Sequence, residues 1–125
     1  IDASDVVHVC TPPNSHEAIG IKTLAKGKNV VIEKPFTGYF GDGEQGFSGD
    51  TFDRKKGLEQ AKQSVQNLLN AEAESEGQIC YAENWVYAPG IQKEREILEK
   101  TGAQILWMHG EEAHSGSHSP FYGIW

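Results

Sequence analysis

Two short runs of β-branched residues, each ended by proline and joined by one helix-length segment, constrain the fold of this chain most. Val6–Cys10 reads VVHVC and is followed by Thr-Pro-Pro, and residues 29–35 read NVVIEKP. Because proline cannot continue a central ladder, both strands are predicted to end there. A strand, a helix and a strand within about 30 residues form a βαβ unit, whose two strands run parallel.

The segment between these strands is predicted to form a helix that begins at Asn14. Asn14 is a good N-cap residue, Glu17 stands at the capping-box spacing, and Gly27 is a good residue to end the helix. The two strands are short and wholly apolar, which predicts a sheet that is covered on both faces.

The rest of the chain extends the same α/β pattern. Residues 36–53 are acidic and glycine-rich, and we expect them to form a long surface loop inserted between elements. Beyond this loop, the apolar periodicity and the breaker residues predict helices over residues 54–73 and 89–100, and strands over residues 78–82 and 103–113.

Composition excludes several classes of function. The chain has 11 Lys and Arg against 18 Asp and Glu, a net charge of −7, which argues against nucleic acid or an anionic membrane as partner. No apolar run approaches the roughly 20 residues of a membrane helix. Cys10 and Cys80 lie in apolar runs and are predicted to be buried, reduced thiols, as is typical of a cytoplasmic protein.

Polar residues follow each of the first three predicted strands. Parallel strands present their carboxyl ends at one edge, where ligands of open α/β sheets bind. The residues expected there are Thr11, Asn14, Lys34, Asn84 and Tyr87. Hydrogen-bonding groups at a helix start favour an anionic or ribose-like ligand, and a lysine favours a hydroxyl, carboxylate or phosphate.

Two of these segments carry a family resemblance. TPPNSH at residues 11–16, followed by VIEKP at residues 31–35, resembles the Gfo/Idh/MocA family, whose T-P-x-x-x-H turn and E-K-P motif lie one βα unit apart. Residues 84–89 also resemble the family segment that leads into the substrate domain. The resemblance implies an NAD(P)-dependent oxidoreductase that transfers a hydride to or from a sugar-, inositol- or polyol-like substrate.

The resemblance also implies roles for individual residues. Lys34 is expected to be catalytic, holding the substrate hydroxyl and helping to relay its proton, with an acid/base partner outside this chain. The residues expected to bind NAD or NADP are Thr11, Pro12, Asn14, His16, Glu33 and Lys34. Those expected to bind the substrate are Lys34, Asn84, Tyr87 and Trp125. From the residues alone, Glu33 either orients Lys34 or merely pairs with it.

The fold implied is the C-terminal half of a Rossmann-type parallel sheet with helical crossovers over residues 1–84. The first elements of a second α+β domain follow over residues 85–125. The family's Gly-rich pyrophosphate turn has no counterpart here, because GDGEQG at residues 41–46 fits G-x-G-x-x-G but is acidic and not followed by a helix start. We therefore expect an internal fragment of the enzyme, with little activity alone.

Two alternatives remain open at this point. The exposed edges of so thin a sheet predict a homo-oligomer, and the chain could be a non-catalytic α/β module that self-associates through them. A cluster near the C-terminus offers possible metal ligands, although its spacing matches no standard site, so no metal is expected. Its members are His109, Glu111, Glu112, His114 and His118.

Overall fold

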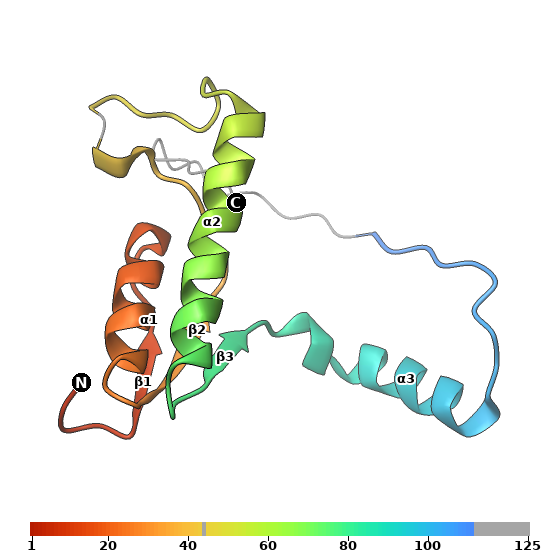
Figure 1. Cartoon of the computed structure of the whole chain (residues 1–125). Coiled ribbons are helices and arrows are strands. Elements are labelled where there is room, and N and C mark those ends of the chain that lie inside the picture. The colour runs from red at the N-terminus through yellow and green to blue at the C-terminus, as the bar shows by residue number, and fades with distance from the viewer. Residues whose placement is uncertain (44, 112–125) are drawn as a thin grey trace. The chain divides into compact units, whose positions relative to one another are not determined.

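The computed structural model of the chain describes residues 1–43 and 45–111 (Figure 1). The described residues divide into two compact units, Ile1–Ala82 and a second unit that begins at Glu83. Their assignment to a cofactor domain and a substrate domain stays a prediction.

The first unit contains a three-stranded parallel sheet in the order β1-β2-β3. Val7 lies beside Val30, and Val30 lies beside Ile79, so the three strands are in register across the sheet. Helices connect the strands, which confirms the predicted α/β class and a partial Rossmann-type sheet. The strands are β1 (Val6–Val9), β2 (Asn29–Glu33) and β3 (Ile79–Ala82).

Helix α1 (His16–Leu24) follows β1 after a short 3-10 turn, Pro13–Ser15. The predicted capping box is wrong: the N-cap is Ser15, which makes no side-chain cap bond, and Asn14 lies inside the 3-10 turn. The physical reason is Pro13, which opens this extra turn before the helix and moves its start past Asn14.

Helix α2 (Arg54–Ala73) has the predicted bounds. It begins where it does because the Asp53 side chain accepts hydrogen bonds from the backbone N–H groups of Lys55 and Lys56, at 2.9 and 3.1 Å. Among its described residues, 36–43 and 45–53, the loop predicted before α2 contains a 3-10 turn, η2 (Gly41–Gly43), and a single bridge residue, Tyr39.

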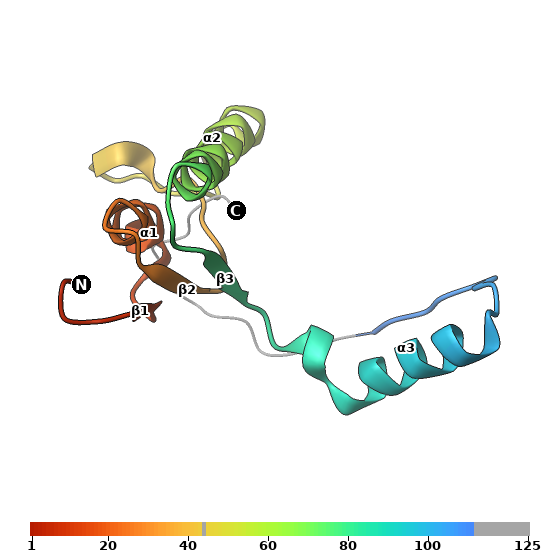
Figure 2. The same cartoon turned by 60° about the horizontal axis from the view of Figure 1, so that its bottom comes forward.

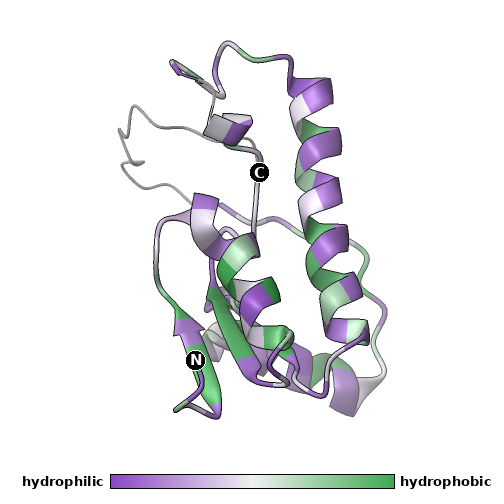
Figure 3. Ribbon diagram, turned by 60° about the vertical axis from the view of Figure 1, so that its left-hand side comes forward, coloured by the Kyte–Doolittle hydropathy of each residue, from purple (hydrophilic) through white to green (hydrophobic). Residues whose placement is uncertain are grey.

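Both helices pack against the same face of the sheet (Figure 2). Since side chains alternate along a strand, every second residue of β1 and β2 enters the core, and these strands are largely hydrophobic in Figure 3. Gly20 lets α1 approach α2 closely, because a Cβ there would lie 2.6 Å from the side chain of Leu68 in α2. The buried core consists of Val9, Leu24, Val30, Ile32 and Leu68.

The other face of the sheet differs from the prediction. Within the first unit no described helix covers it, so the described residues of this unit do not provide the expected cover on both faces. His8 and Cys80, which flank Val31 in the register, point to this face and are exposed. Cys10 is exposed as well, so the prediction of buried thiols is wrong, although both cysteines are free.

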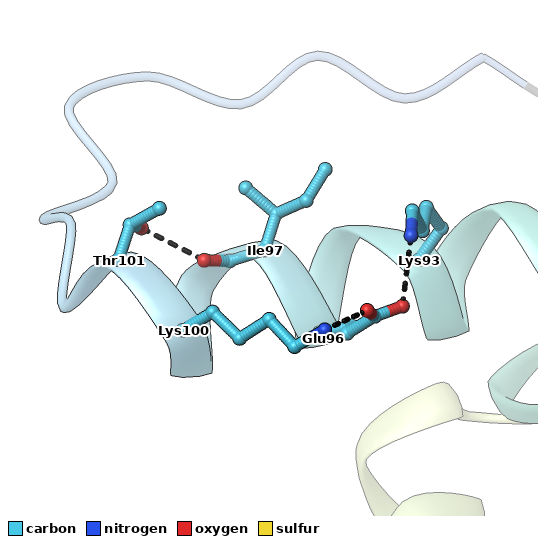
Figure 4. Close-up of polar contacts among 5 residues, drawn as sticks. All are labelled: Lys93, Glu96, Ile97, Lys100 and Thr101. Carbon is cyan, nitrogen blue, oxygen red and sulfur yellow. Dashed lines mark hydrogen bonds and ion pairs between the residues drawn. The ribbon is translucent and has the colours of Figure 1, made fainter.

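The second unit contains a 3-10 turn, η3 (Trp85–Tyr87), and α3 (Pro89–Thr101), which Gly102 ends in the left-handed conformation at φ 60°. Glu96 pairs with Lys93 and Lys100 along the exposed surface of α3 (Figure 4). The strand predicted over residues 103–113 is wrong at 103–111, which have no regular structure and no described strand to pair with. None of the described helices is long and apolar enough to cross a membrane.

Candidate functional site

The segments after β1 and β2 meet at the carboxyl edge of the sheet. Val9 at the end of β1 lies beside Ile32 in β2, so the Thr-Pro turn and the Glu-Lys-Pro segment leave neighbouring, parallel strands at the same level. This is the placement expected from the sequence, and it follows from the parallel register alone.

His16 joins these two segments directly. Its side chain is 0 % exposed, its Nδ1 lies 3.0 Å from the Pro35 carbonyl oxygen, and its Nε2 lies 2.9 Å from the Thr11 carbonyl oxygen. The cofactor contact expected of His16 is therefore not open to its polar atoms, because both ring nitrogens face the main chain inside the protein. His16 therefore connects the Thr-Pro turn and the Glu-Lys-Pro segment from inside the protein.

The Thr-Pro turn presents two polar side chains to solvent. The Ser15 hydroxyl donates to the Pro12 carbonyl at 2.8 Å, so in the 2.6 Å contact between Ser15 and Thr11 the Thr11 hydroxyl is the donor. The Thr11 oxygen keeps lone pairs that can accept from a ligand. Asn14 is exposed and makes no side-chain hydrogen bond within residues 1–43 and 45–111, so its whole amide can meet a ligand.

The Glu-Lys-Pro segment has a fixed backbone and a free amine. Glu33 Oε2 accepts from the backbone N–H of Lys34 at 3.0 Å, which means that Glu33 orients the main chain and does not pair with the amine. One residue beyond Pro35, the Phe36 ring packs against the core. The Lys34 side chain is exposed and takes part in none of the ion pairs among the described residues.

A polar network under this segment was not foreseen from the sequence. The Ser64 hydroxyl donates to Glu17 Oε2 at 2.6 Å, and Asn67 Nδ2 donates to Glu17 Oε1 at 2.8 Å. Since the Ser64 proton is used, the Thr37 hydroxyl is the donor in its 2.5 Å contact with Ser64. Thr37 and Ser64 are only 7 % and 6 % exposed. A signal existed, because Ser64 lies on the buried stripe of α2 between Ala61 and Leu68.

Four predicted site residues remain: Pro12, Asn84, Tyr87 and Trp125. Pro12 is exposed in the turn. Asn84 and Tyr87 belong to the second unit, where the Tyr87 N–H donates to the Asn84 carbonyl at 3.0 Å and both side chains are exposed. Their place beside the substrate stays a prediction. Trp125 lies outside the described residues.

The glycine motif in the loop lacks the geometry of a pyrophosphate site. Gly41, Asp42 and Gly43 have φ of 82°, 46° and 87° in a 3-10 turn, and no helix opens until Arg54. A Gly-rich phosphate turn requires a helix start at the glycines. The structure therefore gives no support for nucleotide binding by this loop.

Metal ligands do not gather in the described part of the chain. No group of three or more His, Cys, Asp or Glu side chains there could hold a metal ion. His109 and Glu111 are exposed, whereas Glu112, His114 and His118 lie outside the described residues.

One protein-family model matches part of the chain. Residues 1–47 match the family model GFO_IDH_MocA, described as an oxidoreductase family with an NAD-binding Rossmann fold. The match spans both motifs and confirms the resemblance, and it supports a nicotinamide cofactor without distinguishing NAD from NADP. No curated protein and no solved structure matches the chain.

Proposed function

We propose that this chain supplies the nicotinamide-ribose side of the cofactor site in an NAD(P)-dependent oxidoreductase of the Gfo/Idh/MocA family, whose model matches residues 1–47. One observation carries the proposal. The exposed amine of Lys34, which has no ion-pair partner among residues 1–43 and 45–111, stands directly beside the Thr-Pro turn, to which His16 ties its segment. A fixed backbone with a free cation lowers the entropic cost of binding a ligand there.

The side chains at this edge suit a ribose and an amide ring. A ribose diol both donates and accepts hydrogen bonds, which matches the Thr11 oxygen and the Asn14 amide. Lys34 adds three N–H donors and a positive charge for a ribose or substrate oxygen. We assign no pyrophosphate contact to the described residues, because the glycine motif at residues 41–46 lacks the required turn.

A nicotinamide cofactor held at this edge by Thr11, Asn14 and Lys34 would supply hydride chemistry, to or from a carbon that bears the substrate's oxygen. The Lys34 amine donates a hydrogen bond to the oxygen on that carbon. Negative charge develops on this oxygen as the hydroxyl proton departs, so a positioned cation stabilises the transition state more than the ground state. The proton is passed to an acid/base group other than the residues of this edge.

The substrate proposed is a sugar-, inositol- or polyol-like molecule. Such molecules carry adjacent hydroxyls, which a lysine together with amide and phenol groups can hold by hydrogen bonds. We propose that Asn84, Tyr87 and Trp125 provide these further contacts. Enzymatic turnover on a polyol in the presence of NAD or NADP would support this assignment.

Cofactor binding can be tested by titrating the ¹⁵N-labelled chain with NADH and with NADPH while backbone amide shifts are recorded by NMR. We expect shifts concentrated at Thr11, Asn14 and Lys34. Lys34→Gln should weaken binding about 10- to 100-fold, since a hydrogen bond from a charged group contributes about 1.5–3 kcal/mol.

Lys22→Gln is the matched control for this titration. Lys22 is also an exposed lysine, but it lies in the last turn of α1, at the opposite end of the crossover from the carboxyl edge. It should leave the affinity unchanged. The proposal fails if neither dinucleotide perturbs the edge, or if the Lys34 and Lys22 variants bind equally well.

The second candidate, a self-associating module, has its own observation. Strands β1 and β3 each pair on one side only within the described residues, and no described helix of the first unit covers one face of the sheet. Unpaired strands can template the addition of another copy. Sedimentation across a wide concentration range tests this candidate, and a monomer at every concentration would eliminate it.

A further inference from the structure

His16 occupies an unusual chemical position at the carboxyl edge. The ring is 0 % exposed and lies between two main-chain carbonyl oxygens, 3.0 Å from that of Pro35 and 2.9 Å from that of Thr11. Carbonyl oxygens only accept hydrogen bonds, so each contact requires a proton on the ring nitrogen that faces it.

The two nitrogens therefore serve different segments. A proton on Nδ1 holds Pro35, the residue after Lys34, and a proton on Nε2 holds Thr11. A neutral imidazole carries one proton and satisfies one carbonyl, whereas a ring that is protonated twice satisfies both. The charged groups on the adjoining segments, Glu17, Glu33 and Lys34, form no ion pair with the ring.

We propose that His16 is the positioning residue for Lys34, acting through the Nδ1–H bond to the Pro35 carbonyl. This inference rests on the proposed cofactor site, because its functional consequence is the affinity of that site. Without the bond, the backbone that carries Lys34 loses the side-chain tie to the Thr-Pro turn that His16 gives it. The amine then samples more positions, and its contact with a ligand weakens without any loss of the amine itself.

Two substitutions separate the ring nitrogens. An asparagine amide places an N–H donor near the position of Nδ1, and a glutamine amide places one near the position of Nε2. His16→Asn should therefore keep the bond to Pro35 and bind NADH with nearly the wild-type affinity. His16→Gln should keep only the bond to Thr11 and bind NADH about 2- to 10-fold more weakly, as expected for one lost hydrogen bond.

Two measurements test the positioning role of His16 without a ligand. In wild-type protein labelled with ¹⁵N-histidine, the His16 Nδ1 signal should show a directly bonded proton, and an unprotonated Nδ1 would overturn the proposal. Amide hydrogen exchange at Lys34 should accelerate in His16→Gln and not in His16→Asn. Equal exchange in the two variants would also overturn it, and the wild-type spectrum stays decisive if either variant fails to fold.

These outcomes are distinguishable from failure of the proposed function. If wild-type protein binds neither dinucleotide but shows the protonated Nδ1 and the selective exchange, the cofactor site is wrong and the positioning device stands as a structural one. If the wild type binds NADH and the asparagine and glutamine variants bind it equally, the cofactor site stands and the positioning role is wrong.

Discussion

Removal of the Ser64 hydroxyl gives the sharpest test of how the Glu-Lys-Pro segment is held. This one hydroxyl joins three elements: it donates to Glu17 of α1 at 2.6 Å, and it accepts at 2.5 Å from Thr37, three residues after Lys34. Ser64→Ala leaves the helix intact and removes both contacts at once, so the site segment loses its tie to α2.

The expected cost follows from what each partner can do afterwards. Thr37 is only 7 % exposed, so its hydroxyl is left without an acceptor, which costs about 1–3 kcal/mol. Glu17 is half-buried and keeps its bond from Asn67, so water can replace part of what it loses. Alanine returns about 0.5 kcal/mol through its higher helix propensity. The net expectation is a loss of about 2 kcal/mol in the free energy of unfolding.

Urea unfolding followed by the NMR signals of the Leu24 and Leu68 methyl groups measures this loss in the core of the first unit. Gln66→Ala is the control, because Gln66 is exposed on the same helix and bonds only to Asn70, a pair worth about 0.2–0.5 kcal/mol. Adding Thr37→Val to Ser64→Ala should recover stability by removing the orphaned hydroxyl. A Ser64 variant no less stable than the control, or a double variant less stable than the single, would refute the reasoning.

Two further predictions concern packing and charge. Gly77→Ala should destabilise the first unit by about 1–3 kcal/mol in the same urea assay, because its Cβ would lie 2.2 Å from the Lys28 carbonyl oxygen. Gly90→Ala, where a Cβ meets nothing within 4 Å, should not. The pKa of Glu96 is lowered in α3, chiefly by its hydrogen bond from Lys100, so the pair favours the helix at neutral pH and this contribution is lost as the pH falls through the lowered pKa. An NMR titration should show the Glu96 midpoint rising in Lys100→Gln together with reduced α3 helicity, and an unchanged midpoint would contradict the assignment.

The elements of the first unit were predictable because their signals are local. Proline ends the apolar runs before both motifs, Asp53 caps α2, and the parallel order follows from helical crossovers between the strands. The edge where the segments of Thr11 and Lys34 leave neighbouring strands follows from this order. The bounds of an element can be predicted from the sequence where proline, glycine or a capping residue ends it or begins it.

The predictions that were wrong share a different cause, because each concerns contacts with residues that are distant in the sequence. Glu17 has the spacing of a capping box, but its carboxylate accepts hydrogen bonds from Ser64 and Asn67 of α2. Cys10 and Cys80 lie in apolar runs, yet both are exposed, because burial depends on which other elements cover a residue. Periodicity predicts that a strand has two faces and does not state whether both are covered.

The geometry also gives a physical reason for the residue types of the two motifs. The 3-10 turn Pro13–Ser15 folds the chain back so that the His16 ring reaches the carbonyl of Thr11, and the same ring reaches the carbonyl of Pro35. Glu33 fixes the backbone N–H of Lys34. Each of these contacts is made to a backbone atom, and none of them involves the Lys34 amine. This arrangement, a held backbone with an exposed amine, is the one that the proposed contact between Lys34 and a ligand requires.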